Sequence, residues 1–331
     1  MKLVSYLDSE SSRQPRFGAL VGAAVVDPGA ASSWAQIACG IPREEVPHSL
    51  SEFINAGPEK WDYTAQVLAE VARSGDPLAL NGSQLVALAV PLAQVRLLPP
   101  IQPLTLRDAY AFEQHVRKAS ENRGRTVPEE WYRFPVFYYT NSNTIYGTDT
   151  EVPYPRYTKS LDYELEIAAV IGKSGKDLDP TEAANTIFGF TIFNDWSARD
   201  IQRAEMKAGL GPAKGKDFAS SLGPCIVTLD ELVDCATGRP GVYDLAMLAR
   251  VNGEERSRGN FKDIYWSFGD IIARASQECS IFPGDVIGSG TVGTGCLLEL
   301  TKGEGPWLRE GDVVELEIEK IGVLRNVVGN N

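Results

Sequence analysis

The sequence is poor in cysteine and histidine, the residue types that dominate zinc, redox and imidazole chemistry. Its five cysteines are odd in number and scattered, and no two of them form a C-x-x-C pair. This spacing argues against a zinc site and a dithiol redox centre, and it favours buried, reduced thiols. With two histidines in the chain, His48 and His115, an imidazole base has few candidates.

Positive charge and long apolar runs are also scarce. Asp and Glu number 44 against 32 Lys and Arg, which gives a formal net charge of −12. A field of this sign repels phosphate backbones and anionic headgroups, so we expect neither nucleic acid nor a membrane as partner. No apolar signal segment follows Met1, and residues 18–26 are too few to span a bilayer, so we expect a cytoplasmic protein. An anionic substrate would need local positive potential from a metal ion and a few Lys or Arg side chains.

The remaining composition is that of a globular protein, with 43% hydrophobic and 23% charged residues over 331 positions. The first hundred residues predict strands at 2–7 and 17–26 and an amphipathic helical stretch around 50–73. Prolines at positions 99, 100 and 103 can continue neither a helix nor a central strand. We therefore predict a small β-rich N-terminal domain at residues 1–98 and a catalytic domain at residues 104–331.

Two glutamates stand at the start of the apolar segment Leu161–Gly172. The pattern alternates around Glu164 and Glu166 and then becomes continuously apolar. A period of two places both glutamates on one face of a strand. A bare E-x-E pair is most often a solvated strand face. The apolar run that follows favours a buried strand instead, where two adjacent carboxylates need a cation.

A second segment, residues 187–202, predicts a buried strand that runs into a helix at Asp195. Asp195, Arg199 and Gln202 would then share one helical face. Two interpretations remain open at this point. Asp195 either stabilises the helix start with Arg199 as an ordinary ion-pair partner, or both side chains belong to a site.

Residues 106–118 predict a helix that opens with Asp108 as its N-cap and carries His115 seven residues later on the same face. A lone helical histidine is more often structural than catalytic. His48, however, lies in a loop next to proline and beside no acidic cluster. His115 is therefore the better candidate for a base.

Two further groups complete the set of candidates. Lys216 lies in G-K-D-F, and a turn-rich stretch, P-G-D-V-I-G-S-G-T at residues 283–291, leads to a predicted strand at 297–300 that contains Glu299. The glycines permit close approach of the backbone to a ligand. Residues 211–216 have the spacing G-x-x-x-G-K with Asp217 next, which differs from a phosphate loop, so we reject nucleotide binding.

Taken together, these segments resemble the fumarylacetoacetate hydrolase family. The motifs that carry the resemblance are D-Y-E-L-E-I-A, N-D-W-S-A-R-D-I-Q, G-K-D-F and P-G-D-V-I-G-S-G-T, which occur in the family's order between residues 105 and 300. The resemblance implies an α+β, β-rich fold: a mixed β-roll with flanking helices, preceded by the small β-rich N-terminal domain. It also implies a homodimer and a role in the breakdown of aromatic compounds.

The resemblance assigns roles to particular residues. The positions that match the family's ligands for Mg²⁺, or for Ca²⁺ or Mn²⁺, are Asp108, Glu164, Glu166 and Asp195. Its water-activating pair is His115 with Glu299, and its oxyanion-stabilising groups are Arg199, Gln202 and Lys216. Its substrate contacts are Tyr110, Tyr138 and Thr291.

The implied activity is metal-dependent hydrolysis of a carbon–carbon bond in a small, anionic β-diketo acid, similar to fumarylacetoacetate or an acylpyruvate. The alternatives are a keto-acid decarboxylase or hydratase of the same family, and a non-catalytic keto-acid-binding protein. The chain departs from the family pattern where Met206 replaces a tyrosine that contacts substrate. It also has a shorter glycine-rich turn before Glu299, and Arg123 and Arg125 both fall near the place of an arginine that binds the distal end of the substrate.

Overall fold

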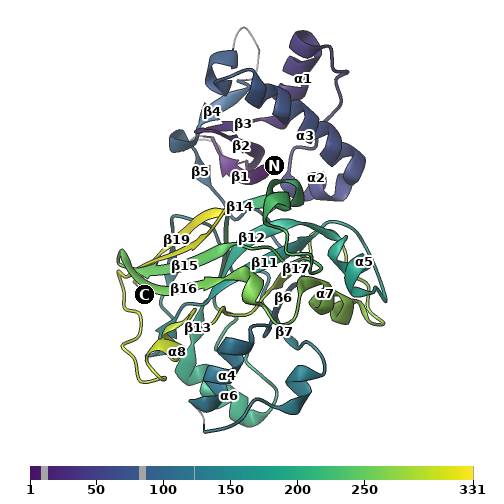
Figure 1. Cartoon of the computed structure of the whole chain (residues 1–331). Helices are drawn as coiled ribbons and strands as arrows, with labels where there is room; N and C mark the ends of the chain where they lie inside the picture. Colours follow the sequence, from purple (N-terminus) through teal and green to yellow (C-terminus); the bar gives the residue numbers. More distant parts are fainter. Residues whose placement is uncertain (9–13, 82–86, 123, 331) are drawn as a thin grey trace.

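Helices α1–α3 pack against short strands at one end of the molecule, and helices α4 and α6 lie at the opposite end (Figure 1). The computed structural model describes residues 1–8, 14–81, 87–122 and 124–330. The N-terminal elements are β1 (Lys2–Leu7), β2 (Arg16–Val21), β3 (Ala24–Val26), α1 (Pro28–Cys39), α2 (Leu50–Ala56), α3 (Pro58–Arg73), β4 (Ala89–Pro91) and β5 (Arg96–Leu97).

The N-terminal elements are more divided than the sequence predicts. The predicted strand at 17–26 is a hairpin of β2 and β3 that turns at Gly22, where φ is 59°. The helical stretch at 50–73 is two helices, because Gly57, with φ 85° and ψ 178°, ends α2 and precedes α3. The domain boundary near residue 100 stays a prediction, and β1 pairs with β14 of the C-terminal part, so one sheet runs through both regions.

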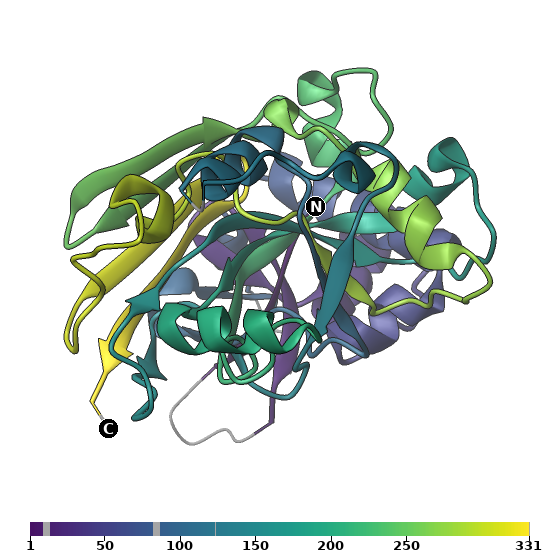
Figure 2. The same ribbon diagram turned by 90° about the horizontal axis from the view of Figure 1, so that it is seen from below.

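The C-terminal part is built around this large mixed sheet, whose order is β4-β3-β2-β1-β14-β12-β11-β17-β6-β7. Its strands here are β6 (Leu106–Ala109), β7 (Phe137–Thr140), β8 (Ile145–Tyr146), β11 (Leu165–Ile171), β12 (Ile187–Asp195), β14 (Ser220–Thr228) and β17 (Val286–Gly288). The helices are α4 (Glu113–Glu121), α5 (Pro180–Ala184), α6 (Arg199–Ala208), α7 (Phe268–Ser276) and α8 (Leu297–Leu300). Seen from below, helices α4 and α6 lie across the ends of the central strands (Figure 2).

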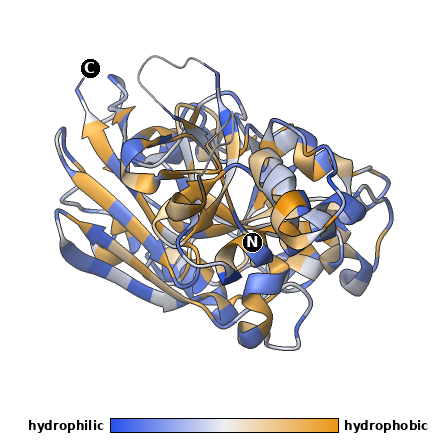
Figure 3. Ribbon diagram, turned by 90° about the horizontal axis from the view of Figure 1, so that it is seen from above, coloured by the Kyte–Doolittle hydropathy of each residue, from blue (hydrophilic) through white to orange (hydrophobic). Residues whose placement is uncertain are grey.

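A second, five-stranded sheet packs beside the first. It has the order β16-β15-β18-β19-β9, with β9 (Thr150–Pro153), β15 (Ala246–Val251), β16 (Glu254–Asn260), β18 (Val313–Ile318) and β19 (Gly322–Gly329). Strands β15 and β18 alternate buried and half-exposed residues, and Figure 3 shows the matching alternation of hydrophobic and hydrophilic colour. One face of this sheet is therefore core and the other meets solvent. A short pair, β10 (Leu161–Asp162) with β13 (Ser197–Ala198), lies next to the site.

Strand β11 separates two hydrophobic cores. Ile167 and Ala169 pack into the larger core, whereas Ala168 and Val170 pack into the core shared with the N-terminal helices. This alternation follows from the period of two, and because both faces are buried the strand is apolar throughout after Glu166. Within the described residues, no helix combines the length and apolar character that crossing a bilayer requires.

Three predicted elements around the site differ from the structure. Residues 106–118 do not form one helix: Asp108 lies in strand β6, and His115 lies in the separate helix α4. Asp195 is the last residue of strand β12, and the helix begins at Arg199. Glu299, predicted to lie in a strand, belongs to the short helix α8.

The expectation of buried thiols is wrong for part of the set. All five cysteines are free, but Cys225 and Cys296 are the buried ones, while Cys39 and Cys279 are exposed.

Candidate active site

Four buried carboxylates from separate segments meet at one place. Each of Asp108, Glu164, Glu166 and Asp195 offers an oxygen that lies within 4.8 Å of the others. Asp108 comes from β6, Asp195 from the end of β12, and the two glutamates lie at and just before the start of β11. The structure thus brings together the four residues that the sequence singled out as metal ligands.

The strand faces explain this convergence. On β11, Glu166 lies on the same strand face as Ala168 and Val170. Its register partner on β12 is Phe193, two residues before Asp195. Because cross-strand partners share a face, Glu166 and Asp195 emerge on the same side of the sheet. Asp108 reaches this side from β6, where its register partner on β17 is Gly288.

Glycine at two positions makes room for the cluster. A Cβ atom on Gly288 would lie 2.5 Å from Oδ1 of Asp108 and 2.7 Å from the Phe193 ring. The backbone N–H of Gly290, where φ is 76°, donates to Oδ1 of Asp108 and to Oε2 of Glu166, at 3.0 Å each. This amide fixes two of the four carboxylates in place.

Two buried cations neutralise part of the acidic charge. Lys216 Nζ donates to Oε2 of Glu164 and to Oδ2 of Asp195, at 2.5 Å each, and an Arg199 NH2 group donates to Oε1 of Glu164 at 2.8 Å. Burial alone would raise the pKa of Glu164, but these two cations bring it below its usual range. The same ion pairs hold the pKa of Lys216 above its usual range despite burial.

For the other three carboxyls, burial outweighs any nearby positive charge. Burial first, and then the neighbouring Asp195 charge, raises the pKa of Asp108 to about 8. Burial, followed by the charges of Asp108 and Glu164, raises the pKa of Glu166 well above its usual value, and burial also raises that of Asp195. Oδ1 of Asp195 is buried and has no hydrogen-bond partner in the described structure. Convergent carboxylate oxygens, with excess negative charge and an unpartnered oxygen, fit a hard divalent cation such as Mg²⁺ or Ca²⁺.

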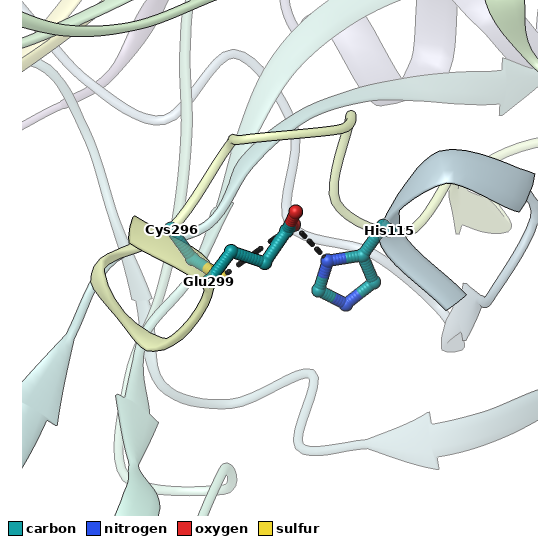
Figure 4. A group of neighbouring side chains, drawn as sticks. All are labelled: His115, Cys296 and Glu299. Carbon is teal, nitrogen blue, oxygen red and sulfur yellow. Dashed lines mark hydrogen bonds and ion pairs between the residues drawn. The ribbon is translucent and has the colours of Figure 1, made fainter. Parts of the chain in front are cut away.

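His115 and Glu299 form a buried pair beside this cluster. Nδ1 of His115 is hydrogen-bonded to Oε1 of Glu299, and the other ring nitrogen points away from Glu299 (Figure 4). Oε2 of Glu299 accepts from the backbone N–H of Thr294 at 3.0 Å, and the Tyr110 ring meets the imidazole edge-on. A carboxylate on Nδ1 fixes the orientation of the ring and leaves the opposite nitrogen to exchange protons.

Arg199 links the carboxylate cluster to this pair. Its Nε donates to Asp162 at 2.8 Å, and Asp162 in turn accepts from the backbone N–H groups of Leu297 and Leu298. These two amides belong to the first two residues of α8, the helix that contains Glu299. Asp162 was missed as a site residue, although it stands two positions before Glu164 in the same motif.

Cys296 was also missed. Its Sγ lies 3.9 Å from Oε1 of Glu299 (Figure 4). Burial raises the pKa of this thiol well above its usual value, and the nearby Asp162 charge adds to the effect. The protonated thiol donates a weak hydrogen bond to Glu299.

A pocket of about 260 Å³ opens onto these groups. Most of the predicted site residues line it: Asp108, Tyr110, His115, Tyr138, Glu164, Arg199, Gln202, Lys216 and Thr291. Glu166, Asp195 and Glu299 are buried and do not line it. The Tyr138 hydroxyl donates to Oδ2 of Asp195, so in this structure it also contacts the cluster. Arg125 is exposed and does not line this pocket, and Arg123 lies outside the described residues.

The fold and site define a class: α+β proteins in which a β-roll holds a carboxylate cluster suited to a divalent cation. Residues 105–329 match the family model described as fumarylacetoacetate (FAA) hydrolase C-terminal. The chain belongs to the fumarylacetoacetate hydrolase family, and the fold implied by its motifs is confirmed.

Individual relatives carry different names for their reactions. A fumarylacetoacetase of Arabidopsis thaliana is 28% identical over 92% of this chain and 87% of its own length. The oxaloacetate tautomerase YisK of Bacillus subtilis is 31% identical over 86% of this chain and 88% of its own length. The solved fumarylacetoacetate hydrolase of Exiguobacterium antarcticum is 26% identical, with a TM-score of 0.71 over the whole of both chains. The relatives thus agree on the family and differ in reaction.

Proposed function

We propose that this protein is a metal-dependent hydrolase that cleaves a carbon–carbon bond in a small β-diketo acid, similar to fumarylacetoacetate or an acylpyruvate. The observation that carries the proposal is the hydrogen bond between His115, which lines the pocket with Asp108 and Glu164, and the buried Glu299. A pair of this kind is needed where water must be activated, and a binding protein has no use for it. Asp108, Glu164, Glu166 and Asp195 would hold the cation, Mg²⁺ in the first instance.

The bound cation would supply a Lewis acid that polarises the keto oxygens of the substrate. His115 then takes a proton from water at its nitrogen remote from Glu299, and the hydroxide adds to the carbonyl carbon at the bond to be broken. Glu299 stabilises the resulting imidazolium through Nδ1. When the tetrahedral intermediate collapses, the carbon–carbon bond breaks, one fragment leaves as a carboxylic acid, and the proton on His115 returns to the carbanion of the other.

The oxyanion of that intermediate needs hydrogen-bond donors. Lys216 has three N–H groups and uses two on Glu164 and Asp195, which leaves one for substrate. Gln202 accepts from Arg199 through its carbonyl oxygen at 3.0 Å, so its NH₂ group is directed elsewhere. Lys216 and Gln202 are therefore the direct donors to the oxyanion, and Arg199 orients Gln202.

A tautomerase is the second candidate, because the relative from Bacillus subtilis carries that name. Moving a proton between the carbon and oxygen of an enol needs an acid–base group such as His115 but no added water. A decarboxylase would likewise need the cation without water addition.

Product analysis in H₂¹⁸O distinguishes these reactions. We expect acylpyruvates or longer diketo acids to give a carboxylic acid that carries ¹⁸O and a ketone or keto acid, and EDTA-treated protein to give neither. Enol–keto exchange of oxaloacetate with no cleavage of any diketo acid would establish the tautomerase instead. Release of CO₂ without ¹⁸O in a new carboxylate would establish a decarboxylase.

A further inference from the structure

A sulfur, a nitrogen and a carboxylate oxygen come together beside the carboxylate cluster. Cys296, His115 and Glu299 each offer one ligand atom within 4.8 Å of the other two, and all three side chains are buried. Figure 4 shows the Glu299 carboxylate in contact with both neighbours, the His115 ring and the Cys296 thiol. The proposed reaction uses His115 and Glu299 alone, so the thiol has no assigned role in it.

Two short helices bring these atoms together. Cys296 is the N-cap of α8 and Glu299 lies in the first turn, so an interval of three residues places both side chains on one side of the helix start. His115 comes from the first turn of α4, which contacts α8. The scattered cysteines gave no sign of this set in the sequence, because a single thiol takes part and its histidine partner lies in a distant segment.

The donor set differs in kind from the neighbouring carboxylate cluster. Four carboxylate oxygens suit a hard cation such as Mg²⁺. A thiolate, an imidazole and one carboxylate together suit Zn²⁺ or a softer divalent ion. Three protein ligands would leave the fourth position of a tetrahedral zinc ion to water. The two sets of ligands therefore favour different metals.

The charges around Cys296 favour a cation over a free thiolate. Burial first, and then the negative charge of Asp162, holds the pKa of the thiol well above its usual value, and the charges of Glu299 and Glu164 act in the same direction. The charge of Arg199 opposes them. A bound divalent ion reverses the effect, because it contacts the thiolate directly and is itself attracted by the surrounding carboxylates.

His115 connects this set to the pocket of about 260 Å³, which its ring lines, whereas Cys296 and Glu299 are buried and do not line it. Zinc binds nitrogen and oxygen ligands at about 2.0–2.2 Å, so two of its ligand atoms stand roughly 3.4 Å apart. A hydrogen-bonded pair lies closer together than this. The His115 ring must therefore shift toward the pocket to admit the ion between itself and Glu299.

We propose that Cys296, His115 and Glu299 form a second metal site, which binds Zn²⁺ and thereby inactivates the water-activating pair. The site itself goes beyond the proposed function, and the loss of activity rests on that function.

The protons account for the inactivation. In the metal-free pair, Nδ1 of His115 carries the proton donated to Glu299, and the Cys296 thiol carries its own. When Zn²⁺ binds Nδ1, the thiolate and the carboxylate, the thiol proton leaves to solvent and the imidazole proton moves to the other ring nitrogen. A neutral imidazole protonated there cannot accept a proton from water, so water is no longer activated.

Cd²⁺ tests the site directly, because a cadmium–thiolate bond absorbs in the ultraviolet and a cadmium carboxylate lacks this band. Titration of the Mg²⁺-loaded protein with Cd²⁺ should give the band with one ion per chain, and added Zn²⁺ should remove it by competition. In Cys296→Ser the band should be lost. In Glu299→Gln, which keeps the thiol, the midpoint of the titration should move to about tenfold higher Cd²⁺ or more.

The double variant Cys39→Ser with Cys279→Ser is the matched control, because it removes two exposed thiols and leaves the buried set as it is. Its titration should match that of the unmodified protein. Absence of the band in the unmodified protein, the same band in Cys296→Ser, or an unmoved midpoint in Glu299→Gln would each overturn the site.

Inhibition by Zn²⁺ connects the site to the reaction. The Zn²⁺ concentration that halves turnover should be about tenfold higher or more in Cys296→Ser than in the unmodified protein. Equal inhibition of the two proteins would refute the inactivation and assign it to zinc at the carboxylate cluster. The cadmium band needs no turnover. A protein that shows the band but cleaves no diketo acid would keep the second metal site and refute the hydrolase, and cleavage without the band would do the reverse.

Discussion

Glu164 is the carboxylate whose charge is best balanced from within the chain, since Lys216 and Arg199 both contact it. Asp108 and Glu166, by contrast, share one backbone amide and repel each other. The cluster therefore has fixed ionised charge on one side and an excess of acidic groups on the other. A divalent cation would bind mainly to that second side and displace the protons that the raised pKa values retain there.

At the residue scale, we expect His115→Ala to lower kcat by about 100-fold, the size of a lost general base. Mg²⁺ binding should persist, because His115 is bonded to Glu299 and not to the four carboxylates. Steady-state kinetics and Mg²⁺ calorimetry measure the two effects.

His48→Ala is the control for this variant. His48 is exposed and does not line the pocket, so its removal should leave kcat within about twofold of the unmodified protein. A near-normal kcat for His115→Ala would assign the base to another residue or favour a reaction that adds no water.

At the element scale, the close approach of β17 to β6 determines where the Asp108 carboxylate lies. Parallel pairing of these strands places Gly288 beside Asp108, and no other residue type leaves space for the Asp108 oxygen and the Phe193 ring together. This contact joins segments 180 residues apart, which explains why the local sequence around Asp108 did not predict a strand.

We expect Gly288→Ala to weaken Mg²⁺ binding by about tenfold or more, because its Cβ would displace the Asp108 ligand. Gly18→Ala is a matched control: its Cβ would also lie 2.5 Å from a neighbour, the Val25 side chain, but far along the chain from the site. Overpacking should destabilise both variants by about 1–3 kcal/mol in urea unfolding.

Only Gly288→Ala should change the Mg²⁺ dissociation constant. If the two variants bind Mg²⁺ equally well, the space at Gly288 does not hold the ligand in position.

At the scale of the whole molecule, the unbalanced carboxyls link folding stability to pH and metal. The pKa of Asp108 is about 8 in the metal-free fold, whereas an unfolded aspartate titrates near 4. Between these values the folded state binds more protons than the unfolded state, so stability decreases as pH rises through this window. The raised pKa values of Glu166 and Asp195 act in the same direction, and the lowered pKa of Glu164 has its effect below this window.

We therefore expect the metal-free protein to melt at a lower temperature at about pH 8.5 than at about pH 6. Mg²⁺ should raise Tm more at the higher pH, by roughly 4 °C or more, because there it competes with fewer protons. Differential scanning calorimetry with and without EDTA measures both trends. In Asp108→Asn the pH dependence should flatten, and an equal Mg²⁺ effect at both pH values would contradict the link.

The sequence by itself identified the candidate residues of the site. The four acidic positions, His115, Glu299 and Lys216 were all identified from local motifs and family resemblance. Residue types and their local spacing can be read from the sequence without knowledge of the fold. It also predicted β1 and the buried strands β11 and β12, whose apolar runs need no distant information to be recognised.

Only the tertiary structure decided which elements carry these groups and what surrounds them. Asp108 and Glu299 lie in segments whose short apolar patterns suit either helix or strand, and pairing or packing with distant residues makes the choice. The role of Asp162 depends on contacts with Arg199 and α8. Arg203 and Lys302, about a hundred residues apart in the chain, line one pocket, and no local pattern shows that their charges share one space.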